Sequence, residues 1–198
     1  MRAGHGRLRL GTAALAAVMA LASAAEAAQF RLIPAAPQPE ALEPGLAVRY
    51  AYPADVKSLG DARNYIRRGA EPGEPLAGLD YPDTRIGEKA LTSRRAEFVA
   101  AEIKGYIRFD APGTWRLEFH SNDGLEVNLG GQRLYVHDGR HPCETQGWVA
   151  VEVPAAGWYP LEAGWFQRLN TSCLMLRVEG PDGTRRWTNV SDYGFRAE

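Results

Sequence analysis

From Ala96 onward, apolar and polar residues alternate with a period of two. The alternation is clearest in "TWRLEFHS" at residues 114–121 and "LEVNL" at residues 125–129, and it recurs at residues 149–153 and 174–179. Turn sequences such as "APG", "NDG", "LGGQ" and "GPDG" separate these runs. A period of two is the strand period, because successive strand side chains point to opposite faces. The sequence therefore predicts an all-β protein, an antiparallel β-sandwich or barrel.

Two further patterns concern the connections. Gly130-Gly131 lies between two alternating runs and fits a two-residue hairpin turn, which needs residues that tolerate positive φ. Residues 54–95 are rich in Gly, Pro, Asp and Arg, so we expect a long loop with at most a short helical turn near residues 61–68. We expect no amphipathic helix.

The N-terminus has the composition of a secretory signal. Three arginines precede the apolar run "LGTAALAAVMALA", and small residues follow near Ala27. The run is shorter than the roughly 18 residues of a membrane span. We expect a signal peptide at residues 1–27, no stable membrane insertion, and export to the periplasm or the cell exterior.

About 170 residues follow the predicted signal peptide, enough for one domain with its own core. Residues 28–43 are rich in Pro and Ala and are expected to form a lead-in, with a β-sandwich domain at residues 44–198. Removing three Arg and one Glu with the signal changes the formal charge from −1 to −3. Without a basic patch, nucleic acid is not expected as a partner.

The chain has two cysteines, Cys143 and Cys173. An isolated pair in an oxidising compartment predicts a disulfide. The bond would carry the loop after "HDGRH" toward the loop that contains "QRLN", because bonded cysteines have Cα atoms within about 7 Å.

Two groups of polar residues are candidate metal ligands. Asn122 and Asp123 precede Gly124 and offer side-chain oxygens of the kind that calcium prefers, and residues 167–170 offer more from a second loop. The alternative is an Asn-Asp-Gly turn with no ion.

His137, Asp138 and His141 lie within five residues and include zinc-type ligands. The alternative is that they are exposed loop histidines. No pair of carboxylates and no nucleophile with its base has an enforced geometry, so we do not expect an enzyme.

Taken together, these segments resemble the protective-antigen domain family (the PA-fourteen domain), which is known from anthrax protective antigen, bacterial glycosidases and fungal adhesins. The resemblance rests on "PGLAVRYAYP", "GYIRFDAPGTWRLEFHSNDGLEVNLGGQRLYVHDGRH", "VEVPAAGWYPLEAGWFQ" and "LMLRVEGPDG". It covers about residues 44–195 and implies a β-sandwich that binds carbohydrate.

The resemblance also implies site residues. In sugar-binding adhesins of the family, two adjacent aspartates joined by a cis peptide hold a calcium ion that contacts sugar hydroxyls. That pair falls on Asn122 and Asp123, so Asn122 departs from the family pattern and removes one charge, which is expected to weaken calcium binding. The remaining implied calcium ligands are Gln167, Leu169 and Thr171. The implied glycan-binding residues are Asn122, Asp123, Gly124, Gln167 and Asn170.

The expected function is therefore a secreted or periplasmic, non-enzymatic carbohydrate-binding domain, with calcium as a candidate cofactor and a glycan or envelope polysaccharide as partner. The alternative is a structural or protein-interaction module of the bacterial envelope, with an envelope protein as partner.

Overall fold

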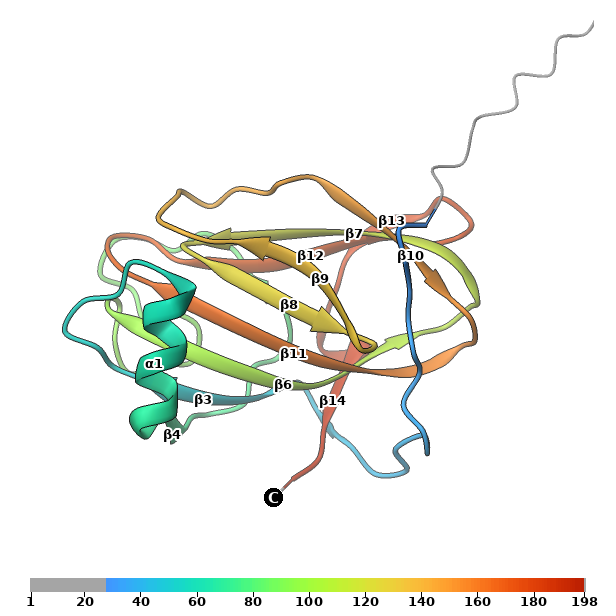
Figure 1. Ribbon diagram of the computed structural model, residues 1–198, viewed down its shortest axis with the longest axis horizontal. Coiled ribbons are helices and arrows are strands. Elements are labelled where there is room, and N and C mark those ends of the chain that lie inside the picture. Colours follow the sequence, from blue (N-terminus) through green and yellow to red (C-terminus); the bar gives the residue numbers. More distant parts are fainter. Residues whose placement is uncertain (1–27, 198) are drawn as a thin grey trace, which may run out of the picture.

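The computed structural model describes residues 28–197, so the predicted signal peptide lies outside the described residues. Two β-sheets face each other, and within residues 28–197 they form a sandwich and not a closed barrel (Figure 1). The first sheet has six strands: β1 (Phe30–Arg31), β10 (Trp148–Val153), β7 (Gly113–Asn122), β12 (Cys173–Glu179), β13 (Arg185–Trp187) and β5 (Asp80–Tyr81). In that sheet only β1 and β10 pair in parallel.

The second sheet has eight strands, all paired antiparallel. They are β2 (Glu43–Pro44), β14 (Tyr193–Phe195), β6 (Val99–Phe109), β11 (Gly157–Gln167), β8 (Leu125–Leu129), β9 (Gln132–His137), β3 (Ala47–Ala51) and β4 (Glu71–Pro72). A short 3₁₀ helix, η1 (Val190–Asp192), precedes β14. The prediction of an antiparallel β-sandwich is confirmed.

The main core lies between the two sheets and is made by the apolar members of the alternating runs. These side chains are buried on β7 (Trp115, Leu117, Phe119), β8 (Leu125, Val127, Leu129), β11 (Leu161, Ala163, Trp165) and β12 (Leu174, Leu176, Val178). Apolar burial of this kind drives sheet packing, and the alternation explains why these side chains lie on the same face of their strands. Gly130 and Gly131 have φ of 54° and 74°, which confirms the predicted turn between β8 and β9.

The sequence predicted at most a short helical turn near residues 61–68, and the structure has a helix of 11 residues there. Helix α1 (Leu59–Gly69) begins at the N-cap Ser58, whose hydroxyl accepts from the backbone N–H of Asp61 at 3.0 Å. Its apolar side buries Leu59, Ala62 and Ile66 against Phe166 of β11 and Ala100 of β6 (Figure 1). The expectation of no amphipathic helix was wrong. Helix α1 was missed because it buries only this narrow stripe, which leaves a weak helical pattern in the sequence.

No helix among residues 28–197 is long and apolar enough to cross a membrane.

Candidate functional site

The chain crosses from one sheet to the other at Asn122-Asp123-Gly124. Asn122 ends β7 and pairs with Cys173 of β12, in the first sheet. Asp123 and Gly124 instead pair with Phe166 of β11, in the second sheet, through two backbone hydrogen bonds of 3.0 Å. The peptide bond between Asn122 and Asp123 is cis, as the family resemblance implies. These three residues therefore stand at one end of the sandwich, where the two sheets meet.

The Asp123 carboxylate joins two loops to this crossing. Its Oδ1 accepts from the backbone N–H of His141 at 3.1 Å, and its Oδ2 accepts from the backbone N–H of Arg168 at 2.8 Å. The residue is only 6% exposed, and burial raises the pKa of its carboxyl above the usual value, although the two backbone donors oppose this shift. A carboxylate that is this poorly hydrated is suited to a cationic or hydrogen-bonding ligand.

Asn122 presents a carbonyl oxygen to the same region. Its amide nitrogen donates to the hydroxyl of Thr171 at 3.1 Å, so the opposite side of the amide carries the acceptor oxygen. Thr171 lies in the loop between β11 and β12, three residues after Arg168. This contact brings together two of the residues that the resemblance assigned to a metal site, Asn122 by its side chain and Thr171 by its backbone carbonyl.

Gln167 is fully buried at the end of β11. Its amide nitrogen donates to the carbonyl oxygen of Leu169 at 2.7 Å, and its Oε1 has no hydrogen-bond partner among the described residues. A buried amide oxygen without a partner is a free ligand of the type that calcium prefers, so this position fits an oxygen-coordinated ion such as calcium.

Asn170 lies at the exposed tip of the loop between β11 and β12. Its φ of 70° is in the left-handed region, which Asn adopts more readily than most residues. Its backbone N–H donates to Glu97 Oε1 at 2.9 Å, which fixes the loop against the segment before β6.

These loops enclose a cavity of ≈ 490 Å³. Five of the residues expected from the sequence line it, namely Asn122, Asp123, Leu169, Asn170 and Thr171, whereas Gly124 and Gln167 do not. Gly124 supports the wall: a Cβ there would lie 2.3 Å from Cε1 of Phe166, so only glycine fits.

Four further lining residues were not among the expected glycan or calcium ligands: Arg140, His141, Pro142 and Arg168. Arg168 also donates from Nε to Asp55 Oδ1 at 2.8 Å. That hydrogen bond is the main reason that the pKa of Asp55 is held below its usual value. The pairing joins residues 113 positions apart in the chain, and no local sequence pattern indicates it.

The predicted disulfide is confirmed. Cys143 and Cys173 are bonded, with Cα atoms 5.8 Å apart. Ser121 and Glu144 form a backbone bridge beside the disulfide. Together they hold the loop that follows β9 beside the end of β7. Residues 140–142 of this loop line the same cavity as residues 168–171, as the position of the cysteines predicted.

Asp138, a candidate zinc ligand from the sequence, has a different role. Its Oδ1 accepts from the backbone N–H groups of Leu59 and Gly139, both at 2.7 Å. The carboxylate thus satisfies a free donor at the start of helix α1 and does not join His137 and His141. Glu144 takes its place beside the two histidines.

No protein-family model matches the sequence, and no curated protein matches it. Solved structures match at low sequence identity. The PA14 domain of the MpAFP antifreeze protein aligns with a TM-score of 0.67 and 14% identity, covering 81% of this chain and 95% of that one.

The sugar-binding PA14 domain of an RTX adhesin aligns with a TM-score of 0.60 and 12% identity, over 77% of this chain and 99% of that one. The epithelial adhesin 9 A domain from Candida glabrata, solved with Galβ1-4GlcNAc, aligns with a TM-score of 0.61 and 16% identity. The alignment covers 83% of this chain and 94% of that one.

The same architecture occurs outside adhesins. An anti-sigma factor domain-containing protein from Clostridium clariflavum aligns with a TM-score of 0.58 and 11% identity, over 79% of this chain and 48% of that one. At such identities the likeness concerns the fold, and a fold does not determine a function. On the sheet topology and these alignments, the protein has a PA14-type β-sandwich fold.

Proposed function

We propose that this chain is a non-enzymatic carbohydrate-binding domain that holds a glycan in the cavity at Asn122 and Asp123. The observation that carries the proposal is the convergence of a buried carboxylate, an amide and two loops on one cavity at the end of a rigid sandwich. Loops on a rigid scaffold are where binding sites are most often built.

The cavity has the chemistry that a sugar needs. A sugar hydroxyl both donates and accepts hydrogen bonds, so it requires acceptors and donors side by side. Asp123 and Asn122 supply acceptor oxygens, and Arg140 supplies donors from the opposite loop. Leu169 and Pro142 add apolar wall area for the C–H face of a pyranose ring.

Calcium is the cofactor that this donor set would hold. The proposed ligands are the side-chain oxygens of Asn122, Asp123 and Gln167 and the backbone carbonyls of Leu169 and Thr171. When bound, the ion would supply direct coordination of sugar hydroxyls. The set carries one formal negative charge, and fewer charged ligands give weaker calcium binding.

The sugars bound by the structural neighbours guide the choice of probe. The matched Candida glabrata adhesin domains were solved with Galβ1-4GlcNAc, Galβ1-3GlcNAc and β-lactose. We infer that a terminal β-galactoside, or an envelope polysaccharide that carries similar sugars, is the first class to test.

We also propose that the domain is exported to the periplasm or the cell exterior. The signal-like N-terminus and the disulfide support this location, because disulfides persist in oxidising compartments. A lead-in at residues 28–43 would then follow a cleaved signal at residues 1–27 and add strand β1 to the first sheet of the domain at residues 44–198.

The test is titration calorimetry with lactose and Galβ1-3GlcNAc, after a glycan array, in calcium and again in EGTA. Asp123→Asn should reduce affinity at least about tenfold, the usual cost of losing a charged hydrogen bond. Asp110→Asn, at the other end of β7, is the matched control and should bind like the wild type.

Folding of both variants is checked by circular dichroism. Unchanged glycan affinity in Asp123→Asn would show that the glycan binds at another site. An absence of binding to every glycan on the array at millimolar levels would favour the alternative, a protein-interaction module of the envelope, which co-purification from envelope extracts then tests.

A further inference from the structure

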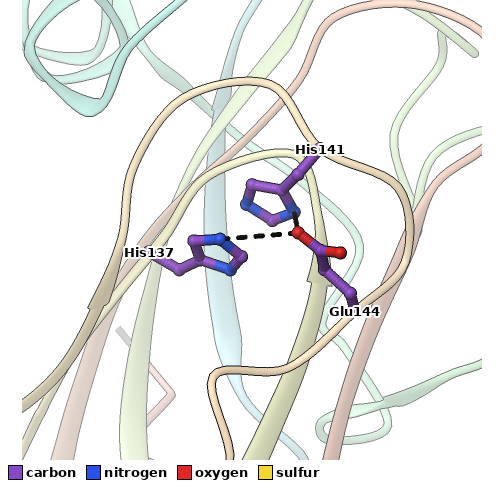
Figure 2. A group of neighbouring side chains, drawn as sticks. All are labelled: His137, His141 and Glu144. Carbon is purple, nitrogen blue, oxygen red and sulfur yellow. Dashed lines mark ion pairs between the residues drawn. The ribbon is translucent and has the colours of Figure 1, made fainter.

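Two histidines and a glutamate meet beside the proposed glycan cavity. His137 ends β9, and His141 and Glu144 lie in the loop between β9 and β10. The imidazole rings are stacked with their centroids 3.5 Å apart and their planes at 8°. Glu144 Oε1 lies 3.7 Å from His137 Nε2 and 3.9 Å from His141 Nδ1, so both contacts converge on one carboxylate oxygen (Figure 2).

The two rings are mostly buried, but their hydrogen-bonding groups are not all satisfied. The side chains of His137 and His141 are 14% and 7% exposed. His137 Nδ1 and His141 Nε2 have no hydrogen-bond partner among the described residues. A buried polar atom without a partner costs free energy, so such atoms point to a missing partner.

The tautomer of His141 follows from its neighbour. His141 Nδ1 lies 3.0 Å from the carbonyl oxygen of Pro142, and a carbonyl only accepts, so Nδ1 carries the proton in that contact. Nε2 is then left with a free lone pair. A histidine that donates one ring N–H to a backbone carbonyl and keeps the other nitrogen bare has the arrangement of a metal ligand.

The backbone holds these three residues in place. The backbone of Glu144 exchanges hydrogen bonds of 3.1 and 3.2 Å with Ser121, and its neighbour Cys143 is in the disulfide. The backbone N–H of His141 is fixed by Asp123. His137 pairs with Leu125 of β8. Ligands on a rigid backbone lose little entropy when an ion binds.

We propose that His137, His141 and Glu144 form a binding site for a divalent transition metal of the zinc class. Each residue offers one ligand atom, and the three atoms lie within 4.8 Å of one another. Two imidazoles and one carboxylate are a known zinc donor set, which leaves the fourth position for water or a ligand. Nitrogen donors favour zinc, nickel or copper over calcium, which takes oxygen ligands.

The geometry requires a small adjustment when the ion binds. Ligand atoms about 2.1 Å from a tetrahedral zinc stand about 3.4 Å apart, so the three ligand atoms, which lie within 4.8 Å of one another, must draw closer. The 3.9 Å contact of His141 involves Nδ1, so its ring must also turn to present Nε2 to the ion. The rings must also turn out of their parallel stack for their lone pairs to meet. Glu144 is 47% exposed at its side chain and can move toward the ion.

The metal site does not depend on the proposed glycan binding. It uses none of the proposed calcium ligands, although His141 also lines the cavity. Zinc binding can therefore be measured without any sugar, and its failure would leave the glycan proposal unaffected.

The test is calorimetric titration of the purified protein, without a histidine tag, with zinc chloride. We expect one ion per chain, and at least about a tenfold loss of affinity in each of His137→Gln, His141→Gln and Glu144→Gln, since each removes one of three ligands. His120→Gln removes the remaining histidine of residues 28–197 and is the matched control, with unchanged affinity.

A measurement on the wild type guards against variants that fail to fold. Cobalt, which occupies zinc sites, should give the intense visible absorption of a four-coordinate nitrogen–oxygen site, and zinc should raise the melting temperature. Excess calcium should not displace either ion. Wild-type protein that binds no zinc, or a His137→Gln/His141→Gln double variant that binds it unchanged, would overturn the proposal.

Discussion

At the scale of single residues, Gly124 and Asp123 show how closely this site is built. Gly124 has no tolerance for a side chain because Phe166 packs on it. We expect Gly124→Ala to lower the free energy of unfolding by about 1–3 kcal/mol, the usual cost of overpacking. Gly164→Ala, where a Cβ meets nothing within 4 Å, should change it by less than about 0.5 kcal/mol. Urea denaturation measures both, and equal effects would contradict the steric explanation.

The pKa values of two aspartates, Asp123 and Asp182, should be shifted in opposite directions. Burial raises the pKa of Asp123 above 3.8, whereas hydrogen bonds from the backbone and side chain of Thr184 lower that of Asp182 below it. A raised folded-state pKa means that the folded protein binds this proton more tightly than the unfolded one. The contribution of Asp123 to stability therefore falls as pH rises from 3.8 through its folded pKa. Carboxyl NMR titration measures both midpoints, and an Asp123 midpoint below that of Asp182 would contradict the assignment.

At the scale of elements, helix α1 depends on a residue from a distant loop. Asp138 accepts from the Leu59 N–H, in addition to the cap that Ser58 provides. We expect Asp138→Ala to lower the free energy of unfolding by about 1 kcal/mol, as loss of a helix cap does, and Asp138→Asn, which keeps an oxygen, to cost less. Hydrogen exchange should quicken at the Leu59 amide in the alanine variant. Unchanged exchange there would show that Asp138 does not hold the helix.

The same helix marks the limit of what the sequence predicts. Strands were predictable because the alternation at residues 114–121 and 125–129 is local and repeats. Helix α1 was not, because its buried stripe has only three residues, one of them Ala62, within a segment rich in Gly and Pro. Asn122 and Asp123 could be singled out because they fall in a recognisable motif. The roles of the Arg140 and Arg168 side chains could not be predicted, since contacts between loops far apart in sequence bring them to the cavity.

At the scale of the whole molecule, one covalent bond holds together the loops that carry both proposed sites. Cys143 lies in the chain between His141 and Glu144, two of the proposed zinc ligands. Cys173 begins β12 directly after the loop that lines the glycan cavity. The closed loop spans 30 residues. On the chain-entropy model, a crosslink of this length stabilises the folded state by about 3–4 kcal/mol.

We therefore expect the Cys143→Ser/Cys173→Ser double variant to be less stable than the wild type by about that amount in urea denaturation. A reducing agent should destabilise the wild type and leave the double variant unchanged, which separates loss of the bond from the effect of the serines. Alkylation of the unreduced, denatured wild type should modify no cysteine. Because the bond holds the loop containing His141 and Glu144 beside β7, the variant should also bind zinc more weakly. Zinc affinity equal to that of the wild type would show that the strand pairing of Glu144 with Ser121 is enough to hold the metal ligands in place.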